Sequence, residues 1–150
     1  MQAKRKNWRE LQKEYWWVEG YYVYEYCKNV HWILRNEPST CLNAGTKVGR
    51  LDFILKTYEI DPETLCQYTG LNDKNGKRIW ENDIVTCNRR EKEAKYKVVW
   101  DKTYADWRIE KINGLGIMPI CIEEGNMPVF GRHYKRIGNI FDNPELLKEV

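Results

Sequence analysis

Carboxylate pairs are the first side chains in this sequence that could do chemistry, because two acids held across a cleft can act as acid and base. Two close pairs occur, Glu81 with Asp83 and Asp101 with Asp106. A catalytic pair must be held at a defined separation inside a cleft. Nothing in the sequence supplies that cleft, so we interpret all four as solvated turn residues and predict no catalytic residue.

Metal ligands are the second chemistry to consider. The run Asp73-Lys74-Asn75-Gly76 resembles part of a calcium loop. Aligning Gly76 with the sixth loop position places Leu71 first and Asn82 twelfth, where two acidic ligands are required. The two histidines, His31 and His133, have no ligand partner at zinc-site spacing. We therefore predict no metal and no cofactor, and interpret the run as a hairpin turn.

Thiol and phosphate chemistry are equally poorly supported. The cysteines contain no C-x-x-C pair, occupy no nucleophile motif, and are odd in number: Cys27, Cys41, Cys66, Cys87 and Cys121. No G-x-x-x-x-G-K-[ST] phosphate loop occurs. Without a signal peptide or an apolar run of the ~20 residues that span a bilayer, five reduced thiols indicate a cytoplasmic protein with no membrane contact. An enzyme is thus the weakest of three functional hypotheses.

Two basic clusters make nucleic-acid binding the second hypothesis. Positive charge beside aromatic side chains can grip single strands through phosphate contacts and base stacking. One cluster combines Lys4, Arg5, Lys6, Arg9 and Lys13, and the other combines Arg89, Arg90, Lys92, Lys95 and Lys97. Glutamates interrupt both clusters, and the net charge is only +3. Solvated charged turns are the simpler interpretation.

An aromatic stretch between residues 15 and 34 supports the first hypothesis, a protein-binding module. Across Gly20, the set Trp17, Tyr21, Val23 alternates with the set Val18, Tyr22, Tyr24, so both faces of a strand here are apolar or aromatic. Such a strand is covered on two sides, or packs one face and offers the other to a partner. We predict Trp17, Tyr22 and Tyr24 as binding residues, together with Arg89, Arg90 and Lys92. The partner is a protein, with a second copy of the chain as one candidate.

The stretch 61–85 organises the second half of the chain. Asp61-Pro62 ends the preceding element, and Gly70 provides a bend. Asn75-Gly76 is the strongest turn signal, because both residues tolerate φ > 0. Short strands then alternate with turns through 96–100, 107–112 and 134–141, a rhythm typical of an all-β barrel.

Two blocks of this sequence resemble the YopX family of phage and prophage proteins. The first is Gln67-Tyr68-Thr69-Gly70-Leu71 followed by Asp73-Lys74-Asn75-Gly76-Lys77 and Asp83-Ile84-Val85; the second is Ile137–Leu147. The N-terminal third matches loosely, through Trp17–Tyr22. The family usually has Gly where this chain has Asn82, and Asn is the residue after Gly that best tolerates the left-handed region. The resemblance implies an SH3-type barrel and a phage origin, and it implies no activity.

The sequence as a whole predicts a mainly β protein. Residues 1–65 form an aromatic-rich β-subdomain with a mobile loop over 37–50, and residues 66–150 form an SH3-like β-barrel. Gly70, Asn75, Gly76 and Asn82 are the expected structural turns. For the first 15 residues two interpretations stay open: a short helix capped at Asn7, from the spacing of Trp8, Leu11 and Tyr15, or the extended arm that the resemblance favours.

Overall fold

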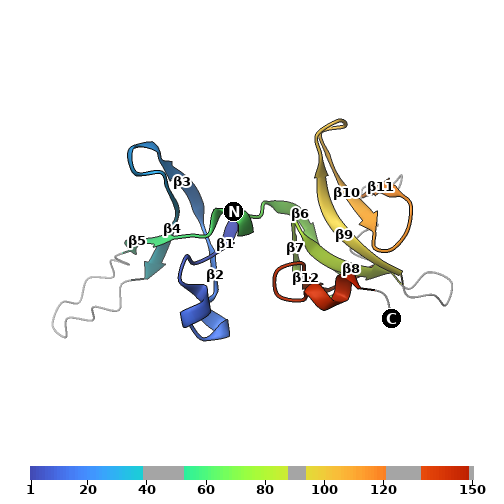
Figure 1. Cartoon of the computed structure of the whole chain (residues 1–150), viewed down its shortest axis with the longest axis horizontal. Helices are drawn as coiled ribbons and strands as arrows, with labels where there is room; N and C mark the ends of the chain where they lie inside the picture. The colour runs from blue at the N-terminus through green and yellow to red at the C-terminus, as the bar shows by residue number, and fades with distance from the viewer. Residues whose placement is uncertain (39–52, 88–93, 121–132, 149–150) are drawn as a thin grey trace, which may run out of the picture. The chain divides into compact units, whose positions relative to one another are not determined.

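The structure, a computed structural model, describes residues 1–38, 53–87, 94–120 and 133–148. The chain divides into two compact units, Met1–Leu65 and Cys66–Val150 (Figure 1). In the described residues the regular structure is β-strand with short 3-10 helices, which confirms the mainly β prediction. The loop expected over 37–50 lies, from residue 39 on, outside the described residues.

In its described residues, the first unit contains five strands, which form two antiparallel sheets. They are β1 (Gln2–Lys4), β2 (Trp17–Glu19), β3 (Tyr21–Glu25), β4 (Val30–Pro38) and β5 (Phe53–Glu59). The 3-10 helices are η1 (Trp8–Glu10), η2 (Lys13–Tyr15), η3 (Tyr26–Lys28) and η4 (Pro62–Thr64). β1 pairs with β2, and the second sheet has the order β3-β4-β5. Asn29, in the left-handed region at φ 51°, turns the chain between β3 and β4.

The N-terminal residues form a strand rather than an α-helix. Trp8 and Tyr15 belong to separate 3-10 turns, and the Asn7 side chain makes no capping bond. The N-terminal segment instead pairs with two other parts of the unit. Ala3 is opposite Val18 on β2, and Arg5 forms an isolated bridge with Ile60. Ala3 therefore lies in the buried cluster with Val18, Ile33 and Ile60. The interpretation as an extended arm is the better one, and the arm is part of the core.

Gly20 lets β2 and β3 continue as one bent strand. A Cβ at this position would clash with the carbonyl oxygen of Leu34 on β4. Because glycine has no Cβ, the backbone of β4 can approach closely at this point. The bend places the first half of the strand against β1 and the second half against β4.

The second unit contains a two-stranded hairpin and a five-stranded antiparallel sheet. The hairpin strands are β6 (Tyr68–Asn72) and β7 (Arg78–Trp80). The sheet has the order β11-β10-β9-β8-β12, from strands β8 (Asp83–Cys87), β9 (Ala94–Asp101), β10 (Asp106–Lys111), β11 (Ile117–Pro119) and β12 (Tyr134–Asn139), and η5 (Pro144–Leu147) follows. Its core consists of Ile79, Val85, Val98 and Ile109.

The turns of the second unit lie where the sequence placed them. Gly70 and Gly76 have φ of 84° and 77°, and Asn82 adopts the left-handed conformation at φ 65°. In the 73–77 turn, the N–H of Gly76 donates to the carbonyl of Asp73 at 2.9 Å, and Asn75 does not itself need a positive φ. Asn82 thus adopts the left-handed turn that the sequence predicts for it.

Candidate protein-binding surface

The bent strand β2–β3 has one packed face and one open face. Val18 is buried in the core of the first unit, and Tyr22 packs against that core. The alternate residues point the other way: Tyr21 is 75% exposed and Val23 is 42% exposed. On β4, Leu34 is opposite Tyr21 and Trp32 is opposite Val23. Leu34 and Trp32 are only partly buried. We call Tyr21, Val23, Trp32 and Leu34 the open face.

Tyr22 and Tyr24 lie on the opposite side of the sheet from this open face. The hydroxyl of Tyr22 shares a hydrogen bond of 2.8 Å with Nδ1 of His31. Tyr24 is 42% exposed, its ring centroid lies 4.8 Å from that of His31, and its hydroxyl donates to Oδ1 of Asn29. Tyr22 is thus half-buried and hydrogen-bonded, whereas Tyr24 keeps exposed surface, and a binding role for either stays a prediction. Tyr21 and Val23, which form the open face, are absent from the predicted set.

The backbone of β3 has a free edge on the side away from β4. The carbonyl of His31 accepts a hydrogen bond from the N–H of Ile60, so His31 points its backbone groups toward β5. Successive residues of a strand alternate in this direction, so Trp32 points its groups toward Val23 on β3. It follows that Tyr22 and Tyr24 direct their N–H and C=O groups away from β4. In the described residues no strand pairs with this edge.

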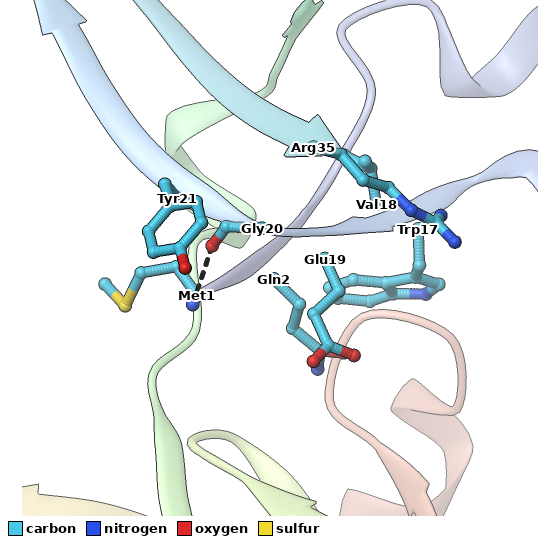
Figure 2. A pocket seen from close by; sticks show the side chains of 8 residues that line it. All are labelled: Met1, Gln2, Trp17, Val18, Glu19, Gly20, Tyr21 and Arg35. Carbon is cyan, nitrogen blue, oxygen red and sulfur yellow. Dashed lines mark hydrogen bonds between the residues drawn. The ribbon is translucent and has the colours of Figure 1, made fainter. Parts of the chain in front are cut away.

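A cavity of about 650 Å³ lies at the start of the open face. Figure 2 shows its lining, which combines aromatic, charged and backbone groups: Met1, Gln2, Trp17, Val18, Glu19, Gly20, Tyr21 and Arg35. The terminal ammonium of Met1 donates to the carbonyl of Gly20 at 3.1 Å, which holds β1 beside the bend. Trp17, predicted as a binding residue, is therefore part of this cavity. Arg35 had no sequence signal that linked it to Trp17.

Lys4 is buried under the tryptophans of the first unit. Its side chain is fully buried, and its Nζ lies 3.7 Å from the ring centroid of Trp8, 4.6 Å from that of Trp16 and 5.6 Å from that of Trp17. An ammonium at these distances is attracted by the negative faces of the rings. Lys4 thus fastens the segment that contains η1 and η2 onto β1.

The first basic cluster is divided between the interior and the surface. Lys4 is buried, Arg5 stacks 4.3 Å from the ring centroid of Tyr58, and Lys6 pairs with Glu59 at 2.5 Å. Arg9 and Lys13 remain exposed beside Trp8 and Trp16. Lys4 and Arg5 are therefore used for packing, while Lys6, Arg9 and Lys13 remain at the surface. In the second cluster Arg89, Arg90 and Lys92 lie outside the described residues, so their predicted binding role stays a prediction.

The first carboxylate pair is divided between the interior and the surface. Asp83 is fully buried, and its Oδ2 lies 2.7 Å from Nε of Arg136 and accepts the N–H of Trp80 at 2.9 Å. Burial raises the pKa of Asp83 to about 6, although Arg136 and the Trp80 N–H act in the opposite direction. Glu81 instead accepts the N–H of Gln67 at 3.3 Å. The prediction of a solvated turn residue is therefore wrong for Asp83, because Arg136 and the Trp80 N–H hold its carboxylate in the interior.

The second carboxylate pair is bridged by an arginine. Nε of Arg108 lies 2.7 Å from Asp106 and 3.3 Å from Asp101. The guanidinium also stacks 3.8 Å from the ring centroid of Tyr104. Hydrogen bonding to Asp106 raises the pKa of Arg108. Both carboxylates therefore neutralise a cation at the β9–β10 turn.

The remaining chemical groups do not converge. Cys27, Cys66 and Cys87 are reduced thiols, while Cys41 and Cys121 lie outside the described residues. Burial raises the pKa of Cys66 to about 12. Across the part of the chain that the structure describes, no three His, Cys, Asp or Glu side chains gather as metal ligands. None of the helices described there has the length and apolar character to cross a bilayer.

Comparison with known proteins identifies the family. The model of the YopX protein family matches residues 6–148, nearly the whole chain. This chain belongs to the YopX family. A comparison with curated proteins gives no match.

Two of the residues that carry the resemblance to YopX proteins, Asp73 and Asn139, accept backbone hydrogen bonds at turns in this member. Only 3% of the surface of Asp73 is exposed, and its carboxylate accepts backbone N–H groups from Asn75, Lys77 and Arg136. Oδ1 of Asn139 likewise accepts the N–H groups of Phe141 and Asp142. The YopX signature in this chain therefore describes how the second unit folds, whereas the exposed aromatic surface lies in the loosely matched first third.

Proposed function

We propose that this YopX protein is a non-catalytic protein-binding module that receives an extended strand of its partner along β3. The observation that supports this proposal is that β3 combines a free backbone edge with exposed side chains. Tyr21, Val23, Tyr24 and the following Tyr26 are 75%, 42%, 42% and 84% exposed. Strand addition to a sheet edge gains affinity from backbone hydrogen bonds and specificity from alternate side chains.

Protein is the partner class that this surface favours. Exposed tyrosines beside a half-buried tryptophan and valine are typical of interface anchors, because one end of each ring is apolar and the other can hydrogen-bond. The alternative of a nucleic-acid partner needs a dense patch of exposed cations, and the first cluster is thinned because Lys4 is buried and Arg5 stacks on Tyr58. The alternative of an enzyme needs converging acids or nucleophiles, and the candidate acids instead bind Arg136 and Arg108.

The wider setting of the proposal comes from the family. We infer a phage or prophage accessory protein that acts in the host cytoplasm, in agreement with the free thiols of Cys27, Cys66 and Cys87. We further infer that the second unit is an SH3-like barrel, in which the β6–β7 hairpin closes over the five-stranded sheet. The support is the shared core, where Ile79 of β7 packs with Val85, Val98 and Ile109.

Capture from the lysate of phage-infected bacteria tests the proposed function. The tagged full chain is compared with the double variant Tyr21→Glu/Val23→Glu, and bound proteins are quantified by mass spectrometry after nuclease treatment. We expect at least one protein that the parent retains and the double variant loses. Leu115→Glu, at a fully exposed apolar residue of the second unit, is the matched control and should retain it. Identical captured sets for parent and double variant would refute the surface, and capture that disappears with nuclease would favour nucleic acid.

A further inference from the structure

We propose that the strand received by β3 is β3 of a second copy of this chain, antiparallel, with Val23 of each copy opposite Val23 of the other. This inference rests on the proposed function and names its partner. A two-fold axis through the Val23 pair would join two sheets into one, in the order β5-β4-β3-β3-β4-β5. Because the same β3 edge is used on both chains, this interface closes at two chains.

The backbone directions of β3 select this register. Tyr22 and Tyr24 are the β3 residues whose N–H and C=O groups point to the free edge, as the Ile60–His31 hydrogen bond requires. In an antiparallel ladder, two outward-pointing residues must face each other to exchange both hydrogen bonds. With Val23 on the axis, Tyr22 of each copy faces Tyr24 of the other. Four backbone hydrogen bonds result.

Other two-fold registers pair fewer groups. Gly20 is the next outward-pointing residue toward the N-terminus, and it is already hydrogen-bonded to Met1. The Met1 ammonium donates to the Gly20 carbonyl at 3.1 Å, and the Gly20 N–H donates to the Met1 carbonyl at 3.0 Å. An axis at Tyr22 would need Gly20 as a partner for Tyr24. An axis at Tyr24 would need Tyr26, which lies in the 3-10 helix η3. The register centred on Val23 is therefore the one that uses the free edge fully.

The side chains are complementary in the same register. Tyr21 of each copy would face Glu25 of the other. Tyr21 is 75% exposed in the single chain, and in the pair its hydroxyl can donate to the Glu25 carboxylate. Lys28 lies 2.7 Å from Glu25 and lowers its pKa, which keeps that carboxylate ionised. On the other face, the rings of Tyr22 and Tyr24 would meet as cross-strand aromatic pairs. Tyr24 would thereby lose its exposed surface.

β3 also lacks the features that protect a solitary edge strand. Natural edges are protected by proline, by lysine, by bulges or by a short length. The β3 sequence Tyr-Tyr-Val-Tyr-Glu contains neither proline nor lysine, and its register with β4 runs without a bulge over five residue pairs. An edge of this kind is expected to be paired in the functional state.

Charge reversal at Val23 tests the proposal, because this register brings the residue against itself. Sedimentation velocity of the parent over a wide micromolar range should show a reversible dimer. Val23→Lys and Val23→Glu each place like charges across the axis, so each variant alone should raise the dimer dissociation constant by about tenfold or more. An equimolar mixture of the two variants, one of them uniformly labelled with nitrogen-15 so that their masses differ, places Lys opposite Glu and should restore a heterodimer that native mass spectrometry identifies.

Three controls keep the outcomes distinct. Val23→Thr keeps a β-branched, uncharged side chain and should dimerise nearly as the parent does. Far-ultraviolet circular dichroism must show that both charged variants fold, and restoration in the mixture demonstrates it independently. A strictly monomeric parent, or a parent dimer that both charged variants retain, would overturn the self-pairing. In either case the lysate experiment still decides the proposed function, since a foreign strand would then be the occupant of β3.

Discussion

Oδ2 of Asp73 accepts a hydrogen bond from the backbone N–H of Arg136 at 3.0 Å, which joins the first turn of the second unit to its last strand. The same carboxylate closes its own turn through the N–H groups of Asn75 and Lys77, at 2.8 Å and 2.9 Å. Nearby, the N–H of Lys74 donates to the carbonyl of Tyr134. One buried side chain thus links residues that are far apart in sequence.

Asp73→Asn should destabilise the protein by about 1.5 to 3 kcal/mol, the usual range for hydrogen bonds to a charged group. Burial raises the pKa of Asp73, but the N–H groups of Lys77, Arg136 and Asn75 outweigh it and the net pKa is lowered. A lowered carboxyl pKa stabilises the fold above the unfolded-state value and is lost as pH falls below about 4. Urea unfolding should therefore show a parent–variant difference that is full at neutral pH and shrinks in acid. Glu110→Gln, at an exposed residue of the same unit, should show no comparable difference.

Asp83 should give the opposite pH dependence. Its pKa is raised to about 6, so between about pH 4 and pH 6 the folded protein binds a proton that the unfolded chain has released. The free energy of unfolding should consequently fall by about 2 to 3 kcal/mol as pH rises through this window. Asp83→Asn removes the titrating group and should flatten that part of the curve, whatever its effect on absolute stability. A parent curve with no slope in the window would show that Arg136 keeps Asp83 ionised.

Gly76→Val should destabilise the protein by about 1 kcal/mol or more, because a β-branched side chain is penalised at positive φ. Gly76 has φ 77°, and a Cβ there would meet no other atom within 4 Å. The loss would therefore come from backbone strain and not from a steric clash. Gly76→Asn is the matched control, because Asn tolerates this region, and its urea midpoint should lie between those of parent and Val variant. Equal midpoints for parent and Gly76→Val would remove the strain argument.

Several turns of this protein were predictable from sequence because they depend on a local preference, whereas Ala105, at φ 51°, is a residue type without one. Gly70, Gly76 and Asn82 are residue types that tolerate positive φ, and all three adopt it. The face of β3 was not predictable in the same way. Both alternating sets are apolar or aromatic, so periodicity could not decide which one packs, and the contact of β1 with Val18 and Ile60 decides it.

The site residues show the same limit. Lys4 has the sequence signature of a solvated cation, and only the return of Trp8 and Trp16 onto β1 buries it. Asp83 and Arg136 are more than fifty positions apart, so their ion pair has no local signal. Long-range pairing of strands creates these contacts, and spacing along the chain does not record it.

The thiols should differ sharply in reactivity in the native protein. Cys27 is exposed, whereas Cys66 is buried with a pKa raised to about 12, which leaves almost no reactive thiolate. A thiol reagent at neutral pH should modify Cys27 quickly and Cys66 only as the protein unfolds. In denaturant without reductant, all five cysteines should titrate as free. Two or more oxidised cysteines in freshly prepared cytosolic material would contradict the reducing compartment.

The buried ammonium of Lys4 offers the sharpest test of how the first unit is held together. Its Nζ lies over the rings of Trp8 and Trp16, and its stem fills space on β1 beside the buried Ala3.

Lys4→Met keeps an unbranched chain of similar length and loses the cation–π attraction, so it should cost about 1 kcal/mol. Lys4→Ala also leaves a cavity and should cost about 2 to 4 kcal/mol. Lys4→Glu places a negative charge against the negative faces of the rings and should be the least stable of the three. Tryptophan emission during urea unfolding gives the midpoints, since Trp8 and Trp16 are two of the seven tryptophans that contribute to it. Lys13→Ala is the matched control, because Lys13 is exposed and lies 5.8 Å from the Trp16 ring centroid. If Lys4→Ala cost no more than Lys13→Ala, the tryptophans would not depend on Lys4, and the segment of η1 and η2 would be held to β1 by its backbone hydrogen bonds instead.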